Sequence, residues 1–313
     1  MDHAFHPGEL AVQARAGVGA LAARVGKVVG TRVPAAAAEF LSAQRVAALG
    51  AADTEGRMWA TLLTGEPGFL AAVDDTTLEI RTRPGPADPL AAALAGPARV
   101  GLVVLEPGVR RRWRFNGTAR PSGGGLTVAL DQVYGNCPKY ISKREPAPAP
   151  AAKPGEATRG TRLTDAQRAA VTSADTFFVA TADDAGHADA SHRGGNPGFV
   201  HAPAPDRVVW PDYLGNAMFM TLGNLAVHAA AGVVFPDWST GGLLHVSGTA
   251  RIVWEHEHAA AFPGAQRLVE LTVEAVVEVP GATGLAWSAP EASRYSPDLA
   301  PARPRPESRR DDG

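Results

Sequence analysis

The stretch SHRGGNPGFV, Ser191–Val200, resembles an earlier stretch, TLLTGEPGFL, Thr61–Leu70, with the same Gly, Pro, Gly and Phe at an offset of 130 (195 − 65). A second pair, FNGTAR at Phe115–Arg120 and VSGTAR at Val246–Arg251, matches at an offset of 131 (246 − 115). Two matches at nearly one offset indicate that the chain contains the same unit twice. This duplication decides the fold that we expect.

The two copies differ inside the shared stretch. The second copy carries His192 and Arg193 where the first carries Leu62 and Leu63. An arginine at a strand end, followed by two glycines, can hold a phosphate with its planar guanidinium while the bare backbone approaches closely. Arg193 could equally be a solvated strand residue beside a glycine β-bulge. The residues alone leave both interpretations open.

A second signal for anion binding follows in VVWPDYLGNAMFMTLGNL. This stretch ends a strand in a turn at Gly215–Asn216 and starts a helix near Met218. The N-terminus of a helix attracts anions because its unpaired N–H groups point outward. Arg193 and this helix start could therefore converge on one phosphate.

Composition limits the class of protein. The chain has 313 residues, 45% of them hydrophobic, a length that suits one large domain or two of ordinary size. Its formal net charge of −2 argues against a nucleic-acid partner. Cys137 is the single cysteine, and His256 and His258 lack the His-Glu-x-x-His spacing, so we expect no metal. The start lacks the pattern of a signal peptide, and no apolar run approaches the ~20 residues of a membrane span. We therefore expect a cytoplasmic protein without a membrane partner.

Short strand patterns separated by turn signals recur along the chain. Between them, REPAPAPAAKPGEATRG indicates an interdomain linker, because proline cannot join a sheet ladder. The predicted fold class is mainly β with some helix (α+β): two small β-barrels packed around a pseudo-two-fold axis. The predicted divisions are an N-terminal helical segment at 1–44, a first barrel at 45–143, the linker at 144–162, a second barrel at 163–280 and a disordered tail at 281–313.

The basic stretch RRRWRFNG has an alternating pattern. On an extended strand Trp113 and Phe115 share one face, and Arg112 and Arg114 share the other. We favour a half-buried strand with a charged outer face. A contact with a cofactor or partner, or with single-stranded nucleic acid, is the alternative.

Several spaced motifs resemble one family. SHRGGNPGFV, WPDYLGNAMFMTLGNL and the GTAR strand are similar to the FMN-binding split-barrel proteins of the pyridoxamine 5′-phosphate oxidase-like family. FHPGELAVQARAGV, RRRWRFNG and DQVYGNCPKYI resemble a tandem long form, related to the N-terminal part of flavin reductase/ferredoxin fusion proteins. The resemblance runs roughly from Phe5 to Val279. It implies two tandem split barrels packed as an intrachain pseudo-dimer, with FMN at the interface between them.

The resemblance also assigns site residues. Arg193 falls where the family has a basic phosphate ligand, whereas Ala217 and Met218 stand where many relatives carry two basic residues, so phosphate binding would depend more on Arg193. Because the first copy is apolar at this point, we expect one FMN per chain, with RRRWRF or GNCPKY of the first half contributing across the interface. The residues assigned to the cofactor are Ser191, His192, Arg193, Gly194, Gly195, Trp210, Pro211, Asp212, Tyr213, Asn216 and Thr221.

The function that the resemblance implies is that of a flavoprotein oxidoreductase. It would transfer two electrons to or from a small-molecule substrate, with NAD(P)H or a partner reductase as the electron donor. One alternative is a reductase that uses the deazaflavin cofactor F420, and another is a non-catalytic protein that binds flavin or haem. The sequence identifies no catalytic side chain, because flavin accepts hydride itself. It leaves a homodimer of the whole chain open.

Overall fold

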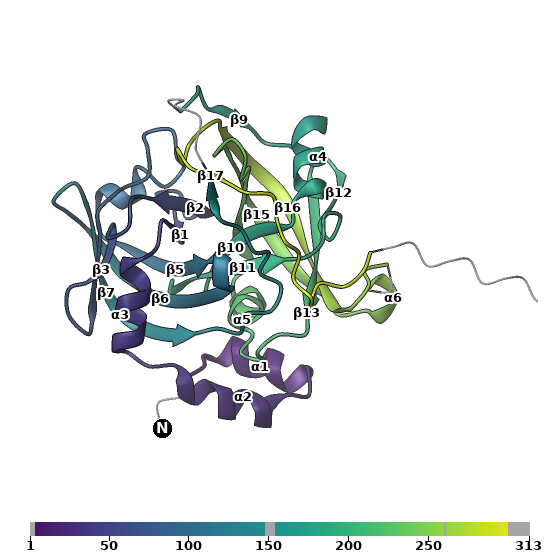
Figure 1. Cartoon of the computed structure of the whole chain (residues 1–313). Coiled ribbons are helices and arrows are strands. Elements are labelled where there is room, and N and C mark those ends of the chain that lie inside the picture. The colour runs from purple at the N-terminus through teal and green to yellow at the C-terminus, as the bar shows by residue number, and fades with distance from the viewer. Residues whose placement is uncertain (1–3, 148–153, 260, 300–313) are drawn as a thin grey trace, which may run out of the picture.

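The computed structural model describes residues 4–147, 154–259 and 261–299. Two β-sheet units of the same topology follow one another along the chain and pack side by side (Figure 1). The strand order is β2-β1-β5-β6-β7-β4-β3 in the first unit and β11-β10-β14-β15-β16-β13-β12 in the second, so equivalent strands occupy equivalent places. The predicted fold class, a mainly β pseudo-dimer of two split barrels, is confirmed.

All neighbouring strands within these two sheets are antiparallel. In the first unit the strands are β1 (Val46–Ala52), β2 (Met58–Thr64), β3 (Leu70–Ala72), β4 (Thr77–Ile80), β5 (Ala98–Glu106), β6 (Arg111–Ser122) and β7 (Gly125–Gly135). In the second they are β10 (Thr176–Ala182), β11 (Ala188–Gly194), β12 (His201–Ala204), β13 (Arg207–Tyr213), β14 (Ala230–Pro236), β15 (Leu243–Val253) and β16 (Ala265–Val279).

The helices are short and lie outside the barrels. They are α1 (Pro7–Arg15), α2 (Gly19–Val25), α3 (Ala35–Ser42), α4 (Asp165–Ser173), α5 (Met220–Val227) and α6 (His256–Ala259), with 3₁₀ turns η1 (Gly26–Val28), η2 (Ala93–Ala95) and η3 (Pro107–Val109). Each half is preceded by a helix, α3 or α4. The N-cap of α4 is Thr164, whose side chain accepts a hydrogen bond from the N–H of Gln167 in a capping box. In Figure 1, α1 and α2 lie together at one end of the molecule, beside α5.

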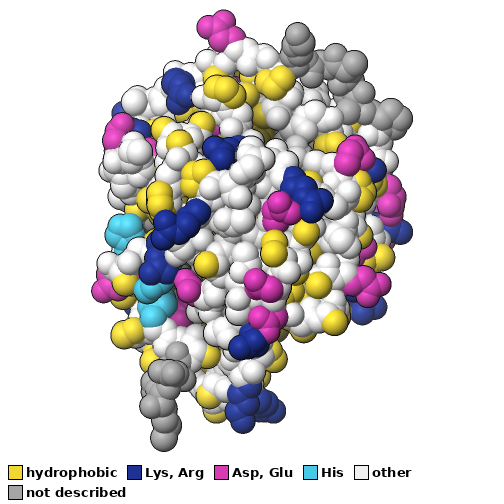
Figure 2. All heavy atoms as spheres, turned by 90° about the vertical axis from the view of Figure 1, so that its left-hand side faces the viewer, with side chains coloured by type: hydrophobic (Ala, Val, Ile, Leu, Met, Phe, Trp, Pro, Cys, Tyr) yellow, Lys and Arg dark blue, Asp and Glu magenta, His cyan; other side chains and the backbone are white. Residues whose placement is uncertain are grey.

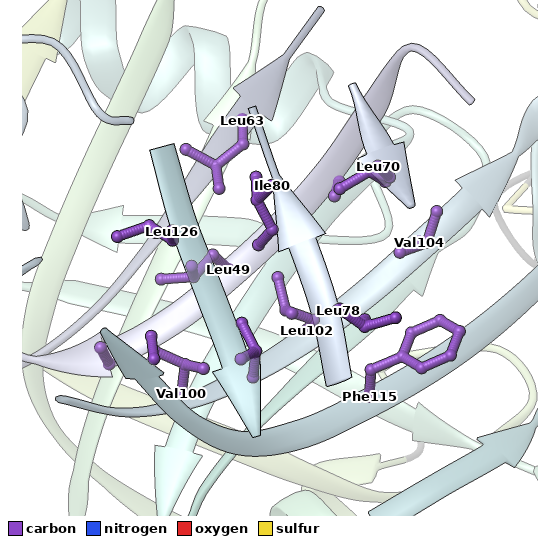
Figure 3. Packing of buried hydrophobic residues seen from close by; sticks show 14 of the residues in the cluster. Leu49, Leu63, Leu70, Leu78, Ile80, Val100, Leu102, Val104, Phe115 and Leu126 are labelled. Carbon is purple, nitrogen blue, oxygen red and sulfur yellow. The ribbon is translucent and has the colours of Figure 1, made fainter. Parts of the chain in front are cut away.

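The three largest hydrophobic cores among the described residues belong to the two barrels and to the interface between them. Leu49, Ile80 and Phe115 belong to the core of the first barrel, where side chains from strands on opposite sides of the barrel meet (Figure 3). Phe177 and Trp210 belong to the core of the second barrel. A third core lies between the barrels and is made of alternate residues of β1, β2, β10 and β11, with further residues of β5, β14 and β15. Because a strand presents successive side chains to opposite faces, the same strands supply both a barrel core and the interface.

The interface between the halves needs glycine where strands cross closely. A Cβ on Gly101 of β5 would lie 2.4 Å from the Cα of Asp189 in β11. A Cβ on Gly232 of β14, the equivalent position of the second half, would lie 2.4 Å from the Cα of Trp59 in β2. The duplication has therefore kept both close crossings.

We expect Gly101→Ala to lower the free energy of unfolding by about 1–3 kcal/mol, because the obstructing atoms are backbone and cannot turn away. Urea unfolding measures the change. Gly85→Ala is the control, since a Cβ there meets nothing within 4 Å. Equal stability of the two variants would contradict the close packing of β5 on β11.

The segments expected to be a linker and a tail take part in the fold. β8 (Pro146–Ala147) pairs with β17 (Ala286–Trp287), and β9 (Thr158–Gly160) adds to β16. The prediction that the tail is disordered from residue 281 onward is therefore wrong for residues 281–299. Trp287 packs edge-on against Trp238 with ring centroids 5.9 Å apart, and the side chain of Asn196 donates to the carbonyl of Pro297. Residues 300–313 of the predicted tail and 148–153 of the predicted linker lie outside the described residues.

Charged side chains of both signs are interspersed on the face shown in Figure 2. Surface ion pairs such as Arg45–Glu66 and Arg99–Asp131 fit this pattern. Within the described ranges, no helix is long and apolar enough to cross a membrane.

Candidate functional site

A cavity of about 180 Å³ lies between the two halves of the chain. The second half contributes the ends of β11 and β13, the loop from Tyr213 to Phe219 and the start of α5. The first half contributes Arg112 and Arg114 of β6 and residues of the segment that follows β7. The cavity is thus a feature of the paired halves and not of either barrel alone.

Nine of the eleven residues predicted from the sequence line this cavity. They come from two strands, a turn and a helix start that are separated by up to 30 residues, and the fold brings them together. They are Ser191, His192, Arg193, Gly194, Pro211, Asp212, Tyr213, Asn216 and Thr221.

The other two predicted residues, Gly195 and Trp210, do not line the cavity. Trp210 is fully buried in the core of the second barrel, edge-on to Phe177 with ring centroids 5.4 Å apart. Strand alternation explains this position, because its neighbours Pro211 and Val209 point to the opposite face of β13. Gly195 leaves room for Phe199, whose ring would lie 2.5 Å from a Cβ there.

The most distinctive feature of the cavity is its positive charge. Arg193 of β11 and Arg112 of β6 both line it and are half-buried, and the guanidinium of Arg112 lies 2.9 Å from Nδ1 of His192. Burial, followed by the nearby arginine charges, holds the pKa of His192 well below its ordinary value, so the imidazole is neutral. Because Arg112 can only donate, we assign the imidazole proton to Nε2, which is buried and has no partner among the described residues.

The charges in this cluster are not balanced within the protein. Burial, together with the charges of Arg114 and Arg193, lowers the pKa of Arg112 to about 9. A guanidinium resists deprotonation, so the shift reports repulsion and lost hydration. Nε of Arg112 is also buried without a partner among the described residues. An anionic ligand would relieve both the repulsion and the missing hydrogen bond.

Hydroxyl groups extend the polar wall beside the arginines. Thr221 in the first turn of α5 donates to the hydroxyl of Ser191 at 2.9 Å, and Ser191 donates to the carboxylate of Asp189 at 3.1 Å. The turn before α5 contains Ala217 and Phe219 with φ of 62° and 61°. Left-handed backbone at non-glycine residues is strained and is concentrated at functional sites.

The strained turn is held from both halves. The side-chain oxygen of Asn216 accepts from the N–H of Met218 at 3.1 Å, and its NH₂ donates to Asn136 of the first half at 2.7 Å. Tyr140, also of the first half and with φ of 66°, donates its hydroxyl to the carbonyl of Leu214.

Aromatic and further charged side chains also line the cavity. The rings of Tyr140 and Tyr213 have centroids 5.1 Å apart, and burial raises the pKa of Tyr213 to about 12. Arg267 of β16 lies 3.5 Å from the carboxylate of Asp212, whose pKa burial raises despite the nearby arginines. These phenols stay protonated at neutral pH and present rings beside the polar wall.

The equivalent positions in the first half are apolar. Leu62 takes the place of His192, and Leu243 stands where the other half has Arg112. A cavity beside Leu62 is only about 10 Å³, and Trp238, Leu285 and Trp287 are among its other lining residues. The two halves therefore differ in chemistry and in space.

The sequence predicts part of what the first half contributes to the cavity wall. The GNCPKY segment supplies Asn136, Cys137, Lys139 and Tyr140 to the cavity wall, as expected of a contribution across the interface. The preferred interpretation of RRRWRFNG was a strand whose arginine face meets solvent. This is wrong for Arg112 and Arg114, which share that face and both line the cavity. The reason is that β6 turns this face toward the second half.

Other lining residues had no signal in the sequence. Arg267 lies in a long strand pattern with nothing to single it out. Ala16 and Val18 come from the junction between α1 and α2, and Leu21 comes from α2. Leu21 is 45% exposed, which places an apolar side chain at the edge of the cavity. In the part of the chain that the structure describes, no group of three or more His, Cys, Asp or Glu side chains could hold a metal ion.

Comparison with known proteins gives the family. The family model described as pyridoxamine 5′-phosphate oxidase matches residues 33–149 and again residues 163–296. None of the curated proteins matches the chain.

Solved structures with a similar fold are shorter and distant in sequence. HupZ from Group A Streptococcus is 16% identical, with a TM-score of 0.31, and the match covers 36% of this chain and 90% of HupZ. An FMN-binding protein from Syntrophomonas wolfei is 11% identical, with a TM-score of 0.27, over 35% of this chain and 83% of that one. HutZ, the heme storage protein from Vibrio cholerae, is 14% identical, with a TM-score of 0.28, and the match covers 39% of this chain and 96% of HutZ.

The family model thus accounts for both barrels, in the two segments that the repeated motifs and the repeated sheet order define independently. The chain belongs to the pyridoxamine 5′-phosphate oxidase family, as a tandem member with two copies of the family's domain.

Proposed function

We propose that the cavity between the halves binds flavin mononucleotide (FMN), one per chain, and that the protein is a flavin-dependent oxidoreductase. The observation that carries this proposal is the pair Arg112 and Arg193. Both line one cavity, and neither forms an ion pair with a carboxylate among the described residues, although Asp212, which pairs with Arg267, lies near Arg193. Membership of the pyridoxamine 5′-phosphate oxidase family supports it.

The residues of the cavity fit the two ends of the cofactor. Arg193 and Arg112 would hold the phosphate, since guanidinium groups match phosphate geometry and charge. Thr221 and Ser191 would add hydroxyl groups, because their present hydrogen bonds leave lone pairs free. Tyr140 and the neighbouring Tyr213 ring offer flat surfaces for an aromatic ring system.

Bound FMN would supply hydride transfer, which requires no ionisable catalytic side chain from the protein. The chain itself would position the cofactor, and its neutral His192 and protonated Tyr213 would keep their protonation states near pH 7. The apolar residues of the N-terminal helices would shield the opening from water. A small-molecule substrate, and NAD(P)H or a separate reductase as electron donor, complete the proposal.

We expect purified protein titrated with FMN to bind one flavin per chain, because the first half has Leu62 and Leu243 where the cavity has His192 and Arg112, and the cavity beside Leu62 is only about 10 Å³. Flavin absorbance against protein concentration, after removal of free FMN, measures the ratio. A ratio near two would contradict a single site per chain. Failure to bind FMN, with binding of F420 or haem in parallel titrations, would replace the proposed cofactor.

A further inference from the structure

The N-terminal helix α1 is bound tightly to the element that shapes the cavity. It crosses α5 so closely that a Cβ on Gly8 would lie 2.3 Å from the carbonyl oxygen of Gly223. The imidazole of His6 hydrogen-bonds Asn224 of α5 at 2.9 Å. Gln13 donates to the carbonyl of Met218 at 3.0 Å, inside the strained turn before α5.

The segment that follows α1 reaches the cavity wall. Beyond α1, Ala16, Val18 and Leu21 line the cavity directly. The guanidinium of Arg15 lies 4.2 Å from the ring centroid of Trp254, and Arg267 lies 5.0 Å from the same ring. The position of α1 is therefore connected to the turn at Met218 and to a charged residue of the wall.

The docked helix buries a carboxyl group in an unfavourable place. Glu9 of α1 is 4% exposed and packs against Gly223 of α5, a helix without charged residues. Its carboxylate accepts one hydrogen bond, from the backbone N–H of His6, whose ring lies 3.7 Å away. It also lines a second cavity, of about 440 Å³, which gives protons access.

Charged groups of the second half and of β6 face Glu9 across this second cavity. Asp189 of β11 and Asp183 after β10 disfavour its ionised form, and Arg114 of β6 favours it. Arg114 is already paired with Asp189, and His187 with Asp183. Arg99 and Asp131, which also line this cavity, pair with each other. The surroundings therefore suit a neutral carboxyl group better than a carboxylate.

We propose that α1 is a proton-coupled latch of the ligand cavity, which docks and completes one wall when Glu9 is protonated and is released when Glu9 ionises. This inference rests on the proposed function only for the identity of the ligand. The docking itself is a property of the chain.

The direction of the pH dependence follows from the two states of Glu9. Burial, above all, raises the pKa of Glu9 from 4.5 to about 8 in the docked helix. A released helix returns the group to its ordinary value. Docking is therefore fully favoured below pH 4.5, weakens as the pH rises, and reaches its minimum above pH 8.

Hydrogen exchange of the α1 amides, compared between the wild type and Glu9→Gln at each pH, tests the latch. The ratio cancels the intrinsic pH dependence of exchange. We expect protection in the wild type to fall about tenfold per pH unit relative to Glu9→Gln between pH 5 and pH 8. Glu39→Gln, which changes an exposed glutamate of α3, should keep the wild-type slope. A constant ratio of wild type to Glu9→Gln would overturn the proposal.

A second arm tests the link to the cavity. If FMN binds only when α1 is docked, FMN at 100 times its Kd should slow exchange of the α1 amides about a hundredfold. Bound FMN that leaves α1 exchange unchanged would overturn the coupling. If FMN does not bind at all, the proposed function fails, but the pH slope without ligand still decides whether the latch exists.

Discussion

Arg193→Ala is expected to weaken FMN binding by about a hundredfold to a thousandfold. Removal of one partner from a charged contact that is shielded from water costs roughly 2–5 kcal/mol, and each 1.4 kcal/mol is tenfold in affinity. Arg193 is half-buried at the end of β11. Among the described arginines that line the cavity with it, Arg112 is the only other one without a carboxylate as an ion-pair partner, so few cations could replace Arg193. Titration of FMN followed by flavin fluorescence measures the loss.

The adjacent residue Arg111 provides a control on the same strand as Arg112. Its side chain is 51% exposed on the opposite face of β6 and pairs with Glu106. We expect Arg112→Ala to weaken FMN binding in the manner of Arg193→Ala, whereas Arg111→Ala should change it less than twofold. If Arg111→Ala and Arg112→Ala behaved alike, or if Arg193→Ala bound FMN normally, the phosphate would not lie at this cluster.

The arrangement of the strands could be predicted from the sequence because the duplication repeats motifs, and repeated motifs produce repeated topology. The faces of individual strands were harder to assign. In RRRWRFNG the two-residue period separates Trp113 and Phe115 from Arg112 and Arg114 correctly, but it does not say which face meets solvent. The second barrel covers the arginine face, and only the packing of the halves shows this.

Two other differences have the same kind of cause. Trp210 was assigned to the cofactor by resemblance, but strand alternation places it in the barrel core beside Phe177. The tail looked disordered because its average hydrophobicity is low, yet a few anchors such as Trp287 and Ser288 hold it against the body. Pattern averages over a segment miss single contacts that long-range packing supplies.

Loss of Asp189 should strongly destabilise the pairing of the halves. Three side chains of the first half converge on this carboxylate of β11: the guanidinium of Arg114 lies 2.8 Å and 2.9 Å from its two oxygens, and Asn116 and Tyr134 each donate at 3.2 Å. Both charged partners are more than nine-tenths buried. A buried pair is costly to form, but removal of one member leaves the other charge uncompensated.

We therefore expect Asp189→Asn to lower the free energy of unfolding by about 3–5 kcal/mol and the Tm by roughly 5–10 °C. The matched control is Asp131→Asn, which removes a carboxylate from the exposed pair with Arg99 and should cost less than about 1 kcal/mol. Asp189→Asn also loses the carboxylate that accepts from Ser191, so the hydroxyl wall of the cavity should loosen and FMN affinity should fall together with stability. If the two variants lost the same stability, Asp189 would not hold the halves together. The cavity would then be built by the apolar interface alone.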